Sequence, residues 1–183
     1  MTGIANTKRA ALLTASFAAA AVLAAFAVTH RGAQSSNPRP VDHYPELFTT
    51  ESTCPAGGDS LDNGRRAEEL ALLRADRYAY NPRDGVRAIK QFQAAESCYR
   101  TVGAERDAAR ARRAHRELSA RVRTHYAAAR VNLRNALQPE RWADALAESR
   151  RLLLLTEHLR RHAYVEWLKN DMGRIAARAS AAP

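Results

Sequence analysis

Apolar and polar positions in residues 64–183 recur every three to four residues, which is the pattern of amphipathic helices. In one stretch, for example, Val86, Ile89, Phe92 and Tyr99 share one helical face. The pattern is interrupted at Pro82, Gly85, Gly103 and Pro139. It therefore predicts five helices, at 64–80, 84–102, 104–137, 141–157 and 162–180. Short connections between them predict an antiparallel all-α domain.

A different pattern occupies the amino-terminal end of the chain. The nineteen residues from Ala10 to Val28 carry no charge and follow Lys8 and Arg9. As a helix they would span about 28 Å, close to the ~30 Å hydrocarbon core of a bilayer. The basic flank predicts a cytoplasmic segment at 1–9 and a transmembrane anchor or signal peptide at 10–29. The length favours an anchor, whereas the small residues around Phe26 leave cleavage after residue 27 open.

The next segment, 30–63, has the composition of a tether between the membrane and the helical domain. It has a net charge of −3 and four prolines, at Pro38, Pro40, Pro45 and Pro55. Prolines at this density exclude a long helix, and no alternating strand pattern replaces it. Apolar residues that can pack onto the folded domain are Val41, Tyr44, Leu47 and Phe48.

Part of the helical region resembles tetratricopeptide-repeat hairpins. The lead-in and second helix of one repeat are similar to Asn81-Pro82-Arg83-Asp84 followed by Ala88-Ile89, Phe92, Ala95 and Tyr99. A looser copy comprises Tyr126, Ala129, Leu133, Ala136-Leu137, Trp142, Ala145-Leu146 and Leu152. The resemblance covers about 67–157 and implies a helical-hairpin scaffold that binds other proteins in a groove. A generic helical bundle has the same periodicity and remains the alternative.

Composition adds an excess of arginine to this description. The chain of 183 residues has 39 Ala, 26 Arg and 3 Lys, with a formal net charge of +10. Such a bias is typical of GC-rich bacterial coding, but six arginines also concentrate in the long helix: Arg110, Arg112, Arg113, Arg116, Arg121 and Arg123. In a cytosolic protein such a basic patch would indicate nucleic-acid binding. For an exported domain, anionic lipid, acidic glycan or an acidic protein surface is the better counterpart.

Candidate catalytic and metal-binding residues are few. The sequence contains no glycine-rich phosphate loop, nucleophile elbow or HExxH motif. His158, His162 and Glu166 have the spacing of metal ligands on a helix. Because residues 157–161 are predicted to form a turn, we interpret these histidines as solvated. The carboxylates, such as Glu68 and Glu69, are interpreted as a solvated face, so no catalytic, cofactor or metal site is expected.

The two cysteines are the remaining candidates for chemistry. Cys98 lies on the apolar face of a predicted helix, and Cys54 lies in the tether. An oxidising compartment favours a Cys54–Cys98 disulfide that fastens the tether to the helix. The alternative is two unrelated thiols, with Cys98 a small core residue and Cys54 free or paired between chains.

These patterns together predict a protein of the bacterial inner membrane with a single membrane pass and a periplasmic carboxyl-terminal domain at 64–183. We expect a non-catalytic scaffold or adaptor that binds protein partners in a membrane-associated assembly. It would contact the inner membrane through residues 10–28, and anionic lipid or an acidic surface is a further candidate partner. The alternative is a basic nucleic-acid-binding module tethered to the membrane.

Overall fold

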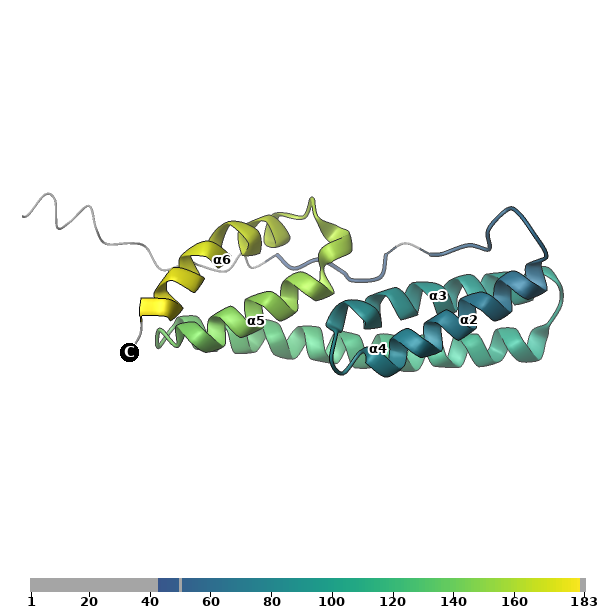
Figure 1. The fold of residues 1–183 in the computed structure, drawn as a ribbon, viewed down its shortest axis with the longest axis horizontal. Helices are drawn as coiled ribbons and strands as arrows, with labels where there is room; N and C mark the ends of the chain where they lie inside the picture. Colours follow the sequence, from purple (N-terminus) through teal and green to yellow (C-terminus); the bar gives the residue numbers. More distant parts are fainter. Residues whose placement is uncertain (1–42, 50, 182–183) are drawn as a thin grey trace, which may run out of the picture. The chain divides into compact units, whose positions relative to one another are not determined.

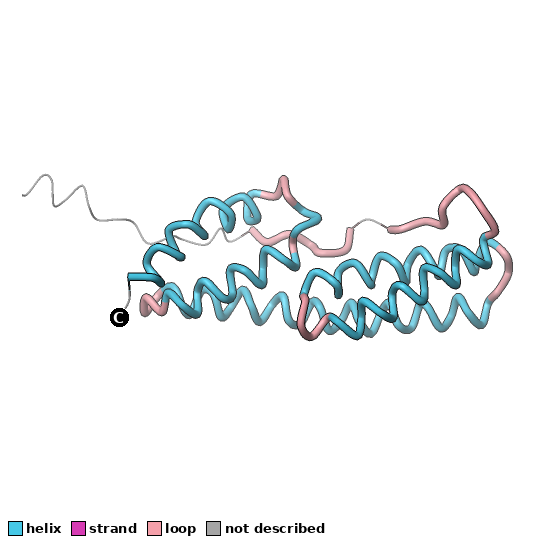
Figure 2. The backbone as a smooth tube through the Cα atoms, in the orientation of Figure 1, coloured by secondary structure: helices cyan, strands magenta, loops and turns pink. Residues whose placement is uncertain are grey.

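The computed structural model describes residues 43–49 and 51–181 of the chain. In this part it contains five α-helices, one short 3₁₀ helix and no strands (Figure 1, Figure 2), which confirms the all-α prediction there. The helices are α2 (Ser60–Arg77), α3 (Pro82–Thr101), α4 (Glu105–Leu137), α5 (Trp142–Leu155), the 3₁₀ helix η1 (Glu157–Leu159) and α6 (Ala163–Ala181). The predicted membrane segment at 10–29 lies outside the described residues. Among the described helices, none combines the length and apolarity needed to cross a bilayer.

The helix boundaries follow local capping chemistry. Helix α2 begins at Ser60, four residues before the predicted start, because the side chain of Asp59 accepts a hydrogen bond from the Asp62 amide at 2.9 Å. Asn81 caps α3 in the same way, and Pro82 fills the first helical position, where a missing N–H costs nothing. Gly103 ends α3 with a φ of +70°, a backbone conformation that favours glycine.

The length of α4 determines how the other helices are arranged. It has 33 residues, about 50 Å at 1.5 Å per residue. Helix α3 has 20 residues and α5 has 14, so each covers only part of α4. Both pack antiparallel to α4, α3 along its first half and α5 along its second (Figure 1). They meet end to end beside the middle of α4, where Pro82, Leu155 and His125 line one small cavity.

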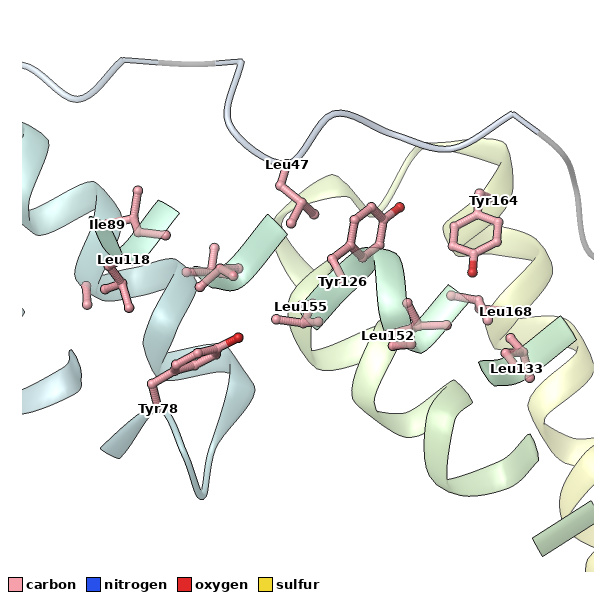
Figure 3. Packing of buried hydrophobic residues seen from close by; sticks show 14 of the residues in the cluster. Leu47, Tyr78, Ile89, Leu118, Tyr126, Leu133, Leu152, Leu155, Tyr164 and Leu168 are labelled. Carbon is pink, nitrogen blue, oxygen red and sulfur yellow. The ribbon is translucent and has the colours of Figure 1, made fainter. Parts of the chain in front are cut away.

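One hydrophobic core runs through both halves of this arrangement. Its buried residues come from all five α-helices, with Ile175 from α6. Tyr78, Ile89, Leu133 and Leu152 are among those drawn in Figure 3. A second, smaller cluster of Ala67, Ala95, Tyr99, Ala108 and Ala111 joins α2, α3 and the beginning of α4. Alanine at these contacts lets the helix backbones approach closely. The alanine-rich composition therefore serves helix packing.

The segment before α2 is part of the folded domain. Residues 43–49 and 51–59, called the strap below, follow an extended path without helix or strand. Leu47 is only 2% exposed and belongs to the main core (Figure 3). Tyr44 and Phe48 pack against the edge of this core. These three are apolar residues of the predicted tether that were expected to pack; the fourth, Val41, lies outside the described residues.

Two glycines provide a matched test of the packing. At Gly85, an added Cβ would lie 2.7 Å from Cε2 of the buried Tyr78 ring, whereas at Gly173 it would meet nothing within 4 Å. We expect Gly85→Ala to lower the free energy of unfolding by about 1–3 kcal/mol through overpacking. Gly173→Ala should raise it by about 0.5–1 kcal/mol, because alanine is the better helix former. Urea unfolding followed by circular dichroism measures both. A Gly85→Ala variant as stable as the wild type would contradict the packing of Tyr78 on α3.

Candidate functional site: a cationic pocket beside a disulfide-fastened strap

The strap is joined to α3 by a Cys54–Cys98 disulfide, the pairing that the sequence favoured. The two Cα atoms lie 4.7 Å apart, and Cys98 is fully buried. The Cys54 amide also donates a hydrogen bond to Oγ of Ser97 at 3.1 Å. In the chain-entropy model, closing a loop of this length, with a sequence separation of 44, stabilises the fold by about 4 kcal/mol. The strap is therefore held at this end by a covalent bond.

Aromatic and cationic contacts hold the rest of the strap along α4. The Tyr44 hydroxyl accepts a hydrogen bond from Arg134 at 2.8 Å, and its ring packs edge-on against Tyr164 of α6. The guanidinium of Arg130 lies 4.1 Å from the Tyr44 ring centroid. Arg123 of α4 stands over Phe48 at 5.5 Å. Three arginines of α4 thus direct their charge at the strap.

His158 of η1 contacts the strap where α3 and α5 meet. Its Nε2 lies 2.7 Å from the carbonyl oxygen of Leu47. A carbonyl can only accept, so Nε2 carries the hydrogen and Nδ1 is the unprotonated nitrogen of the neutral ring. That Nδ1 is buried without a hydrogen-bond partner. Burial is the largest cause that lowers the pKa of His158 below its ordinary value, and nearby Lys90 lowers it further. The expectation that His158 is solvated is wrong, because the strap covers it.

An open pocket lies beside His158. It has a volume of about 720 Å³, within the range of small-ligand and peptide-anchor sites. Apolar contacts come from Val86, Leu154 and Leu159. The remaining lining residues are Arg83, Arg87 and Lys90 of α3 with Glu157, His158, Arg160, Arg161 and His162 of η1 and the turn after it. The pocket therefore combines an apolar surface with five permanent cations and one carboxylate.

The single carboxylate of the pocket is shared among several cations. Glu157 forms an ion pair with Arg83 and lies 3.8 Å from Arg87 and 3.6 Å from Arg160. Lys90 and Arg161 have no ion pair within the described residues. These cations lie near the carboxyl-terminal end of α5, where the helix dipole partly offsets their mutual repulsion. An anionic group entering the pocket would thus meet cations that no carboxylate of the described residues neutralises.

The six arginines predicted to form a basic patch do not form one uniform surface. At 3.6 residues per turn, Arg110 and Arg121 lie on average about 150° around α4 from the group Arg112, Arg116 and Arg123. Arg110 binds Glu68 of α2 with Nη2–Oε2 at 2.6 Å, and Arg112 binds Glu96 of α3 at 2.7 Å. Arg113, like Arg116 and Arg121, is exposed and forms no ion pair within the described part of the chain.

Glu68 differs from the solvated face predicted for it. It is only 8% exposed and accepts hydrogen bonds from the Tyr99 hydroxyl at 2.7 Å and from Arg110. The Arg110 hydrogen bond is the largest cause that lowers the pKa of Glu68. Burial, together with the Glu68 contact, raises the pKa of Tyr99 to about 12. The prediction that Glu68 is solvated is therefore wrong, because Glu68 joins three helices.

The remaining predicted candidates do not form a metal site in the described residues. His158 belongs to η1, His162 to the following turn and Glu166 to α6, so the three do not share one continuous helix. The described part of the chain holds no group of three or more His, Cys, Asp or Glu side chains that could bind a metal. His162 instead stacks on His43 of the strap, with ring centroids 5.6 Å apart.

Sequence reasoning missed the cations of the pocket. One signal was available, because Arg83, Arg87 and Lys90 are spaced four and three residues apart and so share one face of α3. Arg160 and Arg161 were regarded only as evidence against a metal site. Their approach to α3 depends on α5 meeting α3 end to end, which no local pattern encodes.

Comparison with known proteins adds no neighbour to this description. No family model, curated protein sequence or solved structure matches the chain. The resemblance to tetratricopeptide hairpins therefore stays a prediction.

The burial of His158 predicts a dependence of stability on pH, although its hydrogen bond to Leu47 partly opposes the lowering of its pKa. Because the pKa of His158 is lowered in the folded protein, the unfolded chain binds more protons as the pH falls below about 6.5, and acid destabilises the fold. In His158→Gln, the amide nitrogen can still donate to Leu47 but does not titrate. We expect this variant to lose less stability than the wild type between pH 7.5 and 5.5, measured by urea unfolding. His43→Gln, at an exposed ring, is the control. An unchanged pH dependence in His158→Gln would contradict the prediction.

Proposed function

We propose that this protein is a non-catalytic, membrane-anchored adaptor of the bacterial envelope whose helical domain holds an acidic segment of a protein partner in the cationic pocket. The apolar run at 10–28 supports the anchor. The disulfide supports export, since a pair of thiols closes and persists in an oxidising compartment. The proposed location is the inner membrane, with the helical domain in the periplasm.

The composition of the pocket carries the proposal. Five cations surround an apolar surface, and one carboxylate is shared among three of them. A peptide with both acidic and apolar side chains would place carboxylates on Lys90 and Arg161 and apolar groups on Val86 and Leu159. Lys90 is half-buried, so an ion pair with it is screened less by water than a pair at the exposed Arg161.

The arrangement of α4 favours this function over nucleic-acid binding. A phosphate backbone needs many cations on one face, whereas only Arg112, Arg116 and Arg123 of the six predicted arginines lie within about 40° of one another around α4. Arg110, Arg112 and Arg123 are further engaged by Glu68, Glu96 and Phe48. A basic nucleic-acid module remains the alternative that the experiment must exclude.

The test measures binding of a fluorescent peptide of alternating glutamate and leucine to the full-length protein in detergent micelles. We expect the double variant Lys90→Gln/Arg161→Gln to bind this peptide about tenfold more weakly than the wild type, because two ion pairs of about 0.7 kcal/mol each are lost. The matched control Arg113→Gln/Arg116→Gln loses the same charge from α4 and should change the affinity less than twofold. A peptide of alternating glutamine and leucine should not bind at the pocket.

Three results would contradict the proposal. The first is equal weakening in both double variants, which would reflect net charge alone. The second is equal binding of the glutamine peptide, which would reflect partition into micelles. The third is tight binding of a duplex oligonucleotide that Arg113→Gln/Arg116→Gln weakens and the acidic peptide does not displace, which would favour the nucleic-acid alternative.

A further inference from the structure

Helix α2 is at the edge of the domain and leaves a row of apolar side chains uncovered. It packs mainly against α3, and its buried residues are Gly64, Ala67, Glu68 and Ala71. On its other side Leu70 is 46% exposed, Leu72 is 52% exposed and Leu73 is 61% exposed. Tyr80, just beyond the helix, is 91% exposed. Four of the six large hydrophobic residues that are exposed in the described part of the chain thus belong to one segment.

The exposed positions of α2 and of the turn after it follow helix geometry. Arg66, Leu70, Leu73, Arg77 and Tyr80 succeed one another at four, three, four and three residues, and all five are exposed. This spacing places them in a single stripe along the helix. The stripe runs along a helix of 18 residues, about 27 Å long. A partner helix could therefore contact it along most of its length.

Charge distinguishes this face from the long helix α4. Helix α2 carries four arginines and four carboxylates and is neutral overall. Helix α4 carries nine arginines and three carboxylates, a net charge of +6. Two copies of a chain with a net charge of +10 repel one another over most approaches. A neutral face with uncovered leucines is the place where they can meet.

The order of charges along α2 selects an orientation for such a pair. Glu69, Leu73 and Arg77 are spaced by four residues and form one ridge of the helix. Along this ridge the side chains are acidic, then apolar, then basic. If the same ridge of a second copy runs antiparallel, Leu73 faces Leu73 and each Glu69 faces an Arg77. A parallel pair would instead oppose like charges. Ridges spaced by four residues are also those of the commonest class of helix packing.

We propose that α2 is a self-association surface through which two copies of this chain pair antiparallel about Leu73. Leu70 flanks the central contact, and Tyr80 lies at each end near Arg66 of the other copy. Arg77 also pairs with Asp84 of its own chain at 3.3 Å, yet its side chain is 64% exposed and so open to the second copy. The proposal goes beyond the acidic-segment site, which lies on α3, η1 and the turn after it.

Opposite charges at the centre of the contact provide the first test. In an antiparallel pair, Leu73→Glu would bring two glutamates face to face, and Leu73→Lys would bring two lysines face to face. Because like charges repel, each variant alone should associate at least tenfold more weakly than the wild type. An equimolar mixture of the two should recover association, because unlike charges then face each other. Sedimentation of the full-length protein in detergent micelles measures all three samples, and Val131→Glu and Val131→Lys, at a 57% exposed residue of α4, are the controls.

Cross-linking gives a readout that is independent of sedimentation. Both native cysteines are in the disulfide, so Leu73→Cys adds the only free thiol in the chain. We expect a short bismaleimide to join Leu73→Cys chains into a dimer and to leave Val131→Cys chains single.

Each alternative outcome would overturn the proposal. In sedimentation, the contradicting results are a wild type that stays monomeric at about 100 µM, a concentration suited to weak interfaces, and a Leu73→Glu dimer as stable as the wild type. A mixture of the two charged variants that does not recover association would also contradict it. In cross-linking, the contradicting result is equal dimer formation at residues 73 and 131. None of them bears on whether an acidic peptide binds the cationic pocket, so the two proposals fail separately.

Discussion

The mismatch between the length of α4 and the lengths of its partners is the constraint on which the rest of the domain depends. A helix of 33 residues exposes a continuous apolar stripe that neither α3 nor α5 can cover alone. The two shorter helices cover it only by lying end to end, and their junction falls beside the middle of α4. Helix α2 then packs mainly against α3 in the first half, and helix α6 packs mainly against α5 in the second. The main core passes through the junction without interruption.

The junction also explains where the strap and the cationic pocket lie. Helix ends leave backbone carbonyl and amide groups without intrahelical partners, so a junction of two ends cannot be sealed by helix packing alone. The strap contributes Leu47 to the core at this point, and His158 donates a hydrogen bond to the Leu47 carbonyl. The turn after α5 brings Arg160 and Arg161 beside the first turns of α3. The pocket is therefore a consequence of how two helices share a longer one.

Much of the fold could be predicted from the sequence because its signals are local. Periodicity and the breaks at Pro82, Gly103 and Pro139 predict each helix boundary to within four residues. The disulfide could be suggested because only two cysteines exist and one lies on an apolar face. The candidate site could not be predicted, because it depends on contacts between distant segments. Glu68 shows the same limit. From the sequence, a carboxylate among arginines is interpreted as solvated, whereas in the structure three helices enclose it.

Cooperative unfolding tests the role of α4 most directly. Both tryptophans, Trp142 of α5 and Trp167 of α6, lie in the second half of the domain, so their fluorescence reports that half, whereas circular dichroism reports all helices. Ile89→Ala removes a fully buried side chain from α3, in the first half, and should cost about 2–4 kcal/mol. If α4 joins both halves into one unit, the urea midpoints from fluorescence and circular dichroism coincide and fall together in this variant. A fluorescence midpoint that Ile89→Ala leaves unchanged would contradict a shared core.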